Sequence, residues 1–219
     1  MNTHRNIILL AMLLNASVVL PAFNKQPDIH KVKDITFNIK LTVSPDATLP
    51  KGFADSLSKT QDILARIFSS QEFKDSLCKR SFADSSFFKP SKKNCFERIY
   101  SENGKVSGKG VYENLTNSNN VAFEWHIKKY TKGPKPTSLG FATACVYKIT
   151  THDYWLTEGQ YLTLRLVKHL AHEFTHVRGY RHDMNVDKPF KWKRSEDPAY
   201  VVQSIVDNIM LNWRKQGLL

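Results

Sequence analysis

The sequence predicts an α+β fold in which a mixed twisted β-sheet packs against three longer helices. Residues 34–43 and 121–130 alternate apolar and polar side chains, which is typical of half-buried strands. Between them, apolar residues recur at helical spacing over 53–68, and a strand–helix–strand order favours parallel pairing in at least part of the sheet. Two later stretches, one from about residue 157 and one over 198–215, also have helical spacing.

Length and composition indicate one domain that follows a leader. The chain has 219 residues, 41% of them hydrophobic and 24% charged, which suits a single globular domain over 23–219. Residues 1–22 contain Arg5, two short apolar runs and then Pro21-Ala22, as in a signal peptide. Because these runs are shorter than the about 20 residues that span a bilayer, we expect a secreted or periplasmic protein without a transmembrane domain. An uncleaved membrane anchor is the alternative.

The formal net charge of +12 makes polyanionic surfaces candidate partners for a secreted protein. The Lys and Arg residues are scattered along the chain, however, and no nucleic-acid motif is present. A solvated basic surface with no specific nucleic-acid partner is therefore the simpler interpretation. We expect a monomer.

The chain has three cysteines, so one disulfide would leave one thiol unpaired. In an oxidising compartment, Cys78 and Cys95 could close the polar loop 79–94. By the loop-entropy argument, such a bond would contribute about 3 kcal/mol to the stability. Cys145 would then remain a buried thiol within an apolar stretch.

Local patterns predict the remaining connections. A second short helix is expected over 73–77, directly after the first. Residues 79–120 are rich in Ser, Lys, Asn and Gly and are predicted to be mostly loop, with a short candidate strand at 95–100. Gly and Pro mark a turn over 132–136, and His152 is expected in a loop.

Three histidines and one glutamate form the pattern with the most specific chemistry. His172 and His176 are four residues apart, so on a helix both imidazoles lie on one face. Gly179 can adopt the left-handed conformation that ends a helix, which would let His182 return to the same place. Three imidazoles with an open fourth position are a ligand set for catalytic zinc, and the neighbouring Glu173 could act as general base.

Residues 172–183 resemble the HExxHxxGxxH zinc signature of the metzincin metallopeptidases. Asp183 is similar to the acidic residue that some branches carry after the third histidine. The resemblance covers twelve residues and implies a zincin-like catalytic domain that hydrolyses a protein or peptide substrate. It implies one Zn²⁺ per chain on His172, His176 and His182, with Glu173 as the general base.

The same resemblance gives a role to the segment before the zinc helix. In metzincins this place is taken by an edge strand that lines the cleft, so the resemblance implies that Leu139, Gly140, Phe141 and Ala142 bind an extended substrate. An unpaired strand edge offers backbone donors and acceptors to a peptide. An interior strand with a glycine bulge is the alternative.

The sequence departs from the family at the methionine that metzincins place in a turn beneath the zinc. Met184 follows the third histidine too closely for this position. Met210 falls within the helical pattern of 198–215, for which Asp197-Pro198 is a good start. Residues 197–200 are therefore expected to form the floor of the cleft, with Tyr200 as a candidate stabiliser of the transition state.

The preferred interpretation is a secreted zinc-dependent endopeptidase. The alternative is a secreted basic protein for binding or adhesion, in which the zinc is structural and no catalysis occurs. Glu173 speaks against this alternative, because a structural site has no need of that carboxylate. His169 has a helical position for a fourth ligand, but a fourth ligand would fill the open position, so we expect it beside the site and not on the metal.

Overall fold

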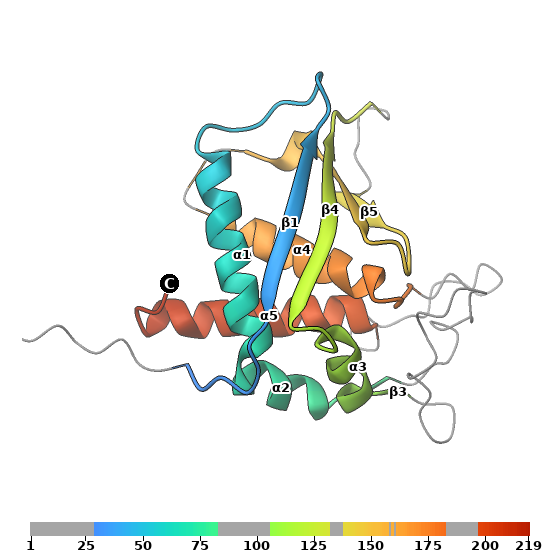
Figure 1. The fold of residues 1–219 in the computed structure, drawn as a ribbon. Helices are drawn as coiled ribbons and strands as arrows, with labels where there is room; N and C mark the ends of the chain where they lie inside the picture. Colours follow the sequence, from blue (N-terminus) through green and yellow to red (C-terminus); the bar gives the residue numbers. More distant parts are fainter. Residues whose placement is uncertain (1–28, 83–105, 132–137, 158, 160, 183–196) are drawn as a thin grey trace, which may run out of the picture.

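The computed structural model of the chain describes residues 29–82, 106–131, 138–157, 159, 161–182 and 197–219 (Figure 1). The predicted signal peptide, the candidate strand at 95–100, the turn at 132–136, Asp183 and Met184 lie outside these residues. Within them, five α-helices and a mixed sheet form an α+β fold, as predicted. No helix in the described part of the chain combines the length and the apolar character that crossing a membrane requires.

A four-stranded sheet forms the upper layer of the fold (Figure 1). Its strand order is β1 (Thr36–Val43), β4 (Asn120–Lys128), β6 (Lys148–His152) and β5 (Gly140–Ala142). The first three strands are parallel to one another, and β5 is antiparallel to β6. The strands predicted at 34–43 and 121–130 and their parallel pairing are confirmed. His152, expected in a loop, is instead the last residue of β6.

The helices cover one face and the lower end of the sheet. Helix α1 (Phe53–Ser69) packs against β1 and α4 (Leu162–Val177), which crosses behind the sheet in Figure 1. Helix α5 (Pro198–Lys215) runs beneath α4 and has the predicted bounds. The short helix α2 (Gln71–Cys78) follows α1 directly, also as predicted.

The predicted loop between α2 and β4 is wrong where the structure describes it. Residues 81–82 and 106–107 pair as β2 and β3, and residues Gly108–Leu115 form helix α3, which packs against α2. The side chain of Ser107 caps α3 by accepting a hydrogen bond from the Gly110 backbone N–H. Because the helix is short and contains two glycines, its local helix propensity is low, and packing decides its conformation.

Helix α4 begins at Leu162, five residues after the predicted start at Thr157. The backbone at Gly159 has a φ of 138°, which no α-helix accommodates. Before it, Asp153–Trp155 form a short 3-10 helix.

The disulfide prediction is wrong. Cys78 is a free thiol, whereas Cys145 is disulfide-bonded. Cys145 is only partly buried and has a φ of 63°, so it belongs to a turn and not to the interior of an apolar strand.

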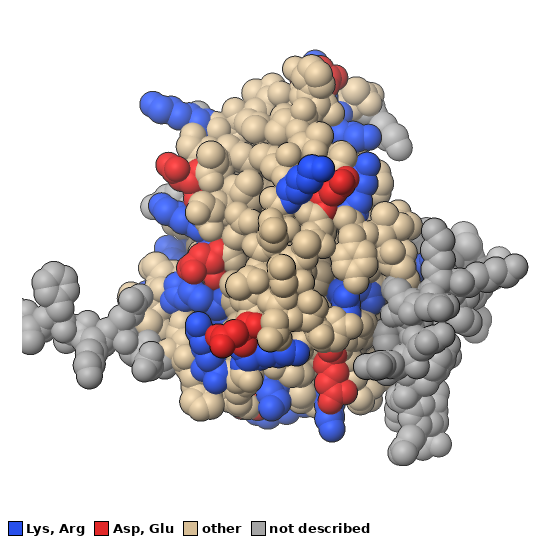
Figure 2. Space-filling view, viewed as in Figure 1, with Lys and Arg blue, Asp and Glu red and all other residues tan. Residues whose placement is uncertain are grey.

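Charged side chains are mixed on the face of the molecule shown in Figure 2. Lys and Arg are spread over this face, and Asp and Glu lie among them. Pairs such as Lys40 with Glu124 and Lys109 with Glu113 lie within ion-pair distance. This face therefore carries no continuous basic patch.

Candidate metal centre

An aromatic cluster fixes the orientation of helix α4 beneath the sheet. Phe174 is buried and contacts Phe37 and Phe68 edge-on and Phe123 in a stacked arrangement, with ring centroids 5.5, 5.9 and 6.0 Å away. The apolar residues at helical spacing along α4 are all buried: Leu162, Leu166, Leu170, Phe174 and Val177. The adjacent face, which carries the histidines of the motif, consequently lines a cleft.

Gly179 ends helix α4 and turns the chain back. Its φ is 106°, a backbone conformation that residues other than glycine rarely adopt. The N–H of Gly179 donates to the His176 carbonyl, and the N–H of Tyr180 donates to the Thr175 carbonyl. These two bonds make up a Schellman motif. The turn residue predicted from the sequence is confirmed, and His182 follows within reach of the helix.

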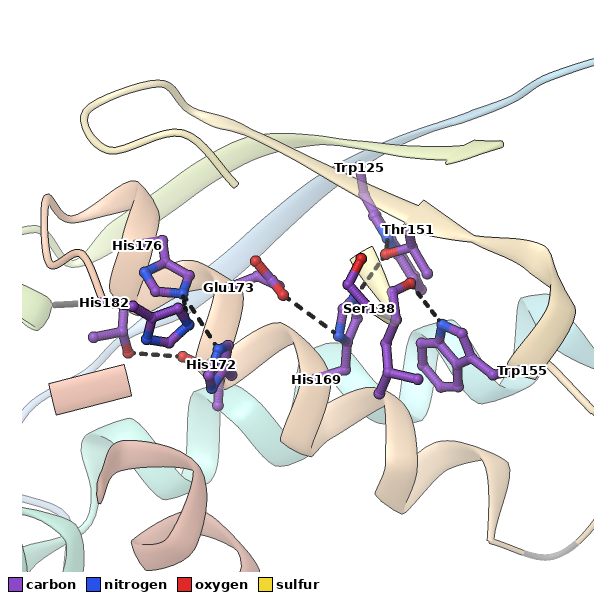
Figure 3. A network of polar contacts seen from close by, with 12 residues as sticks. Trp125, Ser138, Thr151, Trp155, His169, His172, Glu173, His176 and His182 are labelled. Atoms are coloured by element: carbon purple, nitrogen blue, oxygen red, sulfur yellow. Dashed lines mark hydrogen bonds and ion pairs between the residues drawn. The ribbon is translucent and has the colours of Figure 1, made fainter. Parts of the chain in front are cut away.

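His172, His176 and His182 come together as a group that could hold a metal ion, and no other such group is found in the part of the chain that the structure describes. The Nε2 atom of His176 lies 3.2 Å from that of His172 and 3.1 Å from that of His182. Tetrahedral ligands at about 2.0–2.1 Å from a zinc ion would be about 3.3 Å apart. Both distances from His176 match this spacing, and all three ligand nitrogens lie within 4.8 Å of one another (Figure 3).

Hydrogen bonds to the other ring nitrogens indicate which nitrogens are free to bind a metal. His176 Nδ1 lies 2.6 Å from the Tyr180 carbonyl oxygen, which can only accept, so Nδ1 carries the proton. His182 Nδ1 donates in the same way to the Asp197 carboxylate. In neutral rings, both Nε2 atoms then present lone pairs to each other. A metal cation between them satisfies both, so the donor set fits a metal ion.

Burial keeps two of these imidazoles neutral in the metal-free chain. It lowers the pKa of His176 to about 4, and the charge of His182 lowers it further. Burial also lowers the pKa of His172 to about 2, helped by the charges of His176 and His182. The neutral ring is the form that binds metals.

Glu173 lies beside the three histidines and is 5% exposed. Burial raises the pKa of this carboxyl to about 8 in the metal-free chain, opposed by a hydrogen bond from the Ala142 backbone. A bound cation would favour the charged form and counteract the burial. The carboxyl group thus joins helix α4 to strand β5 at the edge of the cleft.

The cleft has a volume of about 860 Å³ and extends along strand β5. Among the described residues β5 ends the strand order of the sheet, so residues 140–142 form an edge strand there and not an interior one. Leu139, just before the strand, and Phe141 are about half exposed, at 46% and 54%. All four residues from Leu139 to Ala142 line the cleft together with the three histidines and Glu173.

The start of helix α5 forms the wall of the cleft opposite β5. Tyr200 stacks on the His182 ring with centroids 5.0 Å apart and meets the His172 ring edge-on at 4.7 Å. Asp197 is fully buried and accepts hydrogen bonds from the backbone N–H groups of Ala199 and Tyr200, which caps α5. Met210 is buried inside α5 and forms no turn beneath the histidines.

Two contacts of the site are not predicted from the sequence. The sequence predicts Asp197 as a helix start and as part of the cleft floor, but not that its second carboxylate oxygen accepts from His182. His169 was placed beside the site, and its ring lies there, with Nδ1 3.8 Å from Glu173 Oε1. Its other nitrogen contacts Thr151, and no sequence pattern marks that residue.

The site therefore consists of three convergent imidazoles, one buried carboxyl group and a strand edge along an open cleft. Comparison with known proteins finds no matching family model, curated relative or solved structure.

Proposed function

We propose that the protein is a secreted zinc-dependent endopeptidase of metzincin type. The observation that carries this proposal is the convergence of three Nε2 atoms beside a buried glutamate, in a cleft bordered by an edge strand. Three histidine ligands leave one coordination position for water or substrate, which distinguishes catalytic zinc sites from structural ones.

His172, His176 and His182 would hold the zinc ion. When bound, zinc supplies a Lewis acid that polarises the scissile carbonyl and lowers the pKa of a water molecule toward about 7. The hydrogen bonds from His176 to the Tyr180 carbonyl and from His182 to Asp197 orient two of these rings and make them better ligands.

Glu173 would act as the general base and then as the general acid. Its carboxylate takes a proton from the attacking water and later delivers it to the leaving amine. Burial raises the pKa of this carboxyl in the metal-free chain, and a bound cation would oppose that shift, so the carboxylate form that accepts a proton would be favoured in the zinc-loaded site.

Strand β5 would bind the substrate backbone. Its free edge faces the cleft, and the exposed side chains of Leu139 and Phe141 can contact residues of an extended peptide. Tyr200, between the rings of His172 and His182, is the candidate stabiliser of the transition state. Residues 1–22 resemble a signal peptide, which supports export.

A mixed-peptide library tests the proposal. The zinc-loaded protein should cleave peptides, a chelator should stop cleavage, and added zinc should restore it. Glu173→Gln should lower kcat by at least about 100-fold and retain one zinc per chain. Glu124→Gln, which changes a glutamate on β4 away from the cleft, should keep full activity.

His182→Ala should lose most of its zinc, since two histidines hold the ion far more weakly than three. Full activity in Glu173→Gln, or full zinc content in His182→Ala, would contradict the assignment. Zinc binding without cleavage of any peptide would favour the alternative of a binding protein with a structural zinc.

A further inference from the structure

A chain of polar contacts leads from the centre of the sheet to Glu173 (Figure 3). The Trp125 indole N–H on β4 donates to Thr151 Oγ1 on β6 at 2.7 Å. The same hydroxyl lies 2.8 Å from His169 Nε2 on helix α4. The opposite ring nitrogen of His169 lies 3.8 Å from Glu173 Oε1, one helical turn further along.

The donors in this chain favour one tautomer of His169. An indole N–H can only donate, so the Thr151 oxygen is its acceptor. The hydroxyl proton of Thr151, which is fully buried, then has His169 Nε2 as the acceptor within reach. A ring that accepts at Nε2 carries its proton on Nδ1, and this N–H faces the Glu173 carboxyl.

Neighbouring groups enclose the His169 ring, which is 5% exposed. Trp155 packs edge-on against it, with centroids 5.0 Å apart. On strand β5, a Cβ atom added to Gly140 would lie 3.1 Å from His169 Cε1 and 2.3 Å from the Thr150 carbonyl oxygen. The ring therefore has little freedom to turn away from Glu173.

We propose that His169 is a positioning residue that holds Oε1 of Glu173, so that Oε2 remains directed at the reacting water. This inference rests on the proposed function. Glu173 Oε2 is buried and has no hydrogen-bond partner among the described residues, as expected for the oxygen that receives a proton from substrate water. At 3.8 Å the contact is longer than a hydrogen bond, and such contacts in a free active site shorten in the complex with substrate.

Two isosteric variants separate positioning from packing. In His169→Asn, the amide nitrogen replaces Nδ1 and keeps a donor toward Glu173. In His169→Gln, the amide occupies the Nε2 position and keeps only the contact with Thr151. We expect the Gln variant to lose about 10- to 100-fold in kcat with little change in KM, and the Asn variant to retain most of the kcat. Both variants should keep one zinc per chain, because His169 is not a ligand.

A variant of Thr151 covers the case in which the His169 variants do not fold. Thr151→Ser keeps the hydroxyl and should keep the kcat, whereas Thr151→Val should lower it. Equal kcat values in the Asn and Gln variants, or in the Ser and Val variants, would overturn the positioning role.

The tautomer provides a readout that does not depend on activity. Long-range ¹H–¹⁵N spectra of the imidazole should show a proton on Nδ1 of His169 in the wild-type protein, both with and without zinc. A proton on Nε2, with zinc-dependent hydrolysis intact, would overturn the positioning role alone. A wild-type protein that binds zinc and hydrolyses nothing would overturn the proposed function and the positioning role together.

Discussion

Asp197 Oδ2 accepts a hydrogen bond from His182 Nδ1, while Oδ1 of the same carboxylate accepts from the Ala199 N–H at the start of helix α5. One buried side chain thus fixes the third histidine and the C-terminal helix together. Carboxylates that accept from a ligating histidine fix its tautomer and make it a stronger ligand. The two functions of Asp197 can be separated by mutation.

Asp197→Asn should weaken metal binding without unfolding helix α5. Asparagine is as good a helix cap as aspartate, so the contact with the Ala199 N–H is kept. Its amide would present N–H to the Nδ1–H of His182, however, which favours the tautomer with the proton on Nε2. We expect the affinity for zinc to fall about 10- to 100-fold, measured by competition with a chromophoric chelator.

Asp207→Asn is the matched control, because Asp207 lies on the same helix and pairs with Lys168. This variant should keep the wild-type affinity for zinc. Unchanged affinity for zinc in Asp197→Asn would show that the carboxylate caps the helix but does not strengthen metal binding.

The parts of the fold that follow from local pattern could be predicted from the sequence. Alternation located β1 and β4, and the Asp197-Pro198 pair located the start of α5 at the correct residue. The spacing of His172, His176 and His182 predicted their convergence, because helix periodicity and one glycine turn determine it.

Features that depend on contacts between distant segments could not be predicted. Thr151 meets His169 only because β6 lies over α4, and Asp197 meets His182 across fifteen residues of chain. Helix α3 was missed for the same reason, since its glycines disfavour a helix and its packing against α2 stabilises it. Periodicity carries no information on which segments meet in space.

Gly108→Ala should destabilise the protein, although alanine is ordinarily a better helix former than glycine. A Cβ atom at this position would lie 1.8 Å from the Leu77 carbonyl oxygen and 2.8 Å from that of Arg80, and both of these atoms belong to the backbone. The first turn of α3 would have to move away from α2. We expect a loss of about 1–3 kcal/mol in the free energy of unfolding, measured by urea denaturation.

Gly110→Ala is the matched control in the same helix. Its Cβ atom would meet only the Ser107 hydroxyl at 3.3 Å, and alanine is the better helix former by about 1 kcal/mol. The midpoint of its urea denaturation should equal or exceed that of the wild-type protein. Similar losses in the two variants would show that the contact with α2 does not require a glycine at 108.

The contribution of His169 to the stability of the metal-free protein should fall as the pH falls below about 6.5, the ordinary pKa of histidine. Burial lowers the pKa of His169 to about 3 in the folded chain, and the charge of His152 lowers it further. Between these two pKa values the unfolded chain binds a proton at this residue and the folded chain does not. Proton binding therefore favours unfolding, by about 1.4 kcal/mol for each pH unit.

His169→Gln removes this group, so its free energy of unfolding should fall less steeply with acid. Between pH 7 and pH 5 the wild-type protein should lose roughly 2 kcal/mol more than the variant, measured by urea denaturation with a chelator present. His172 and His176 act in the same direction in both proteins and cancel in the comparison. Between pH 8 and pH 7, above both pKa values of His169, the two proteins should change equally. Parallel stability curves down to pH 5 would show that His169 gains its proton as readily in the folded chain as in the unfolded one, and that its ring is not held neutral between Thr151 and Glu173.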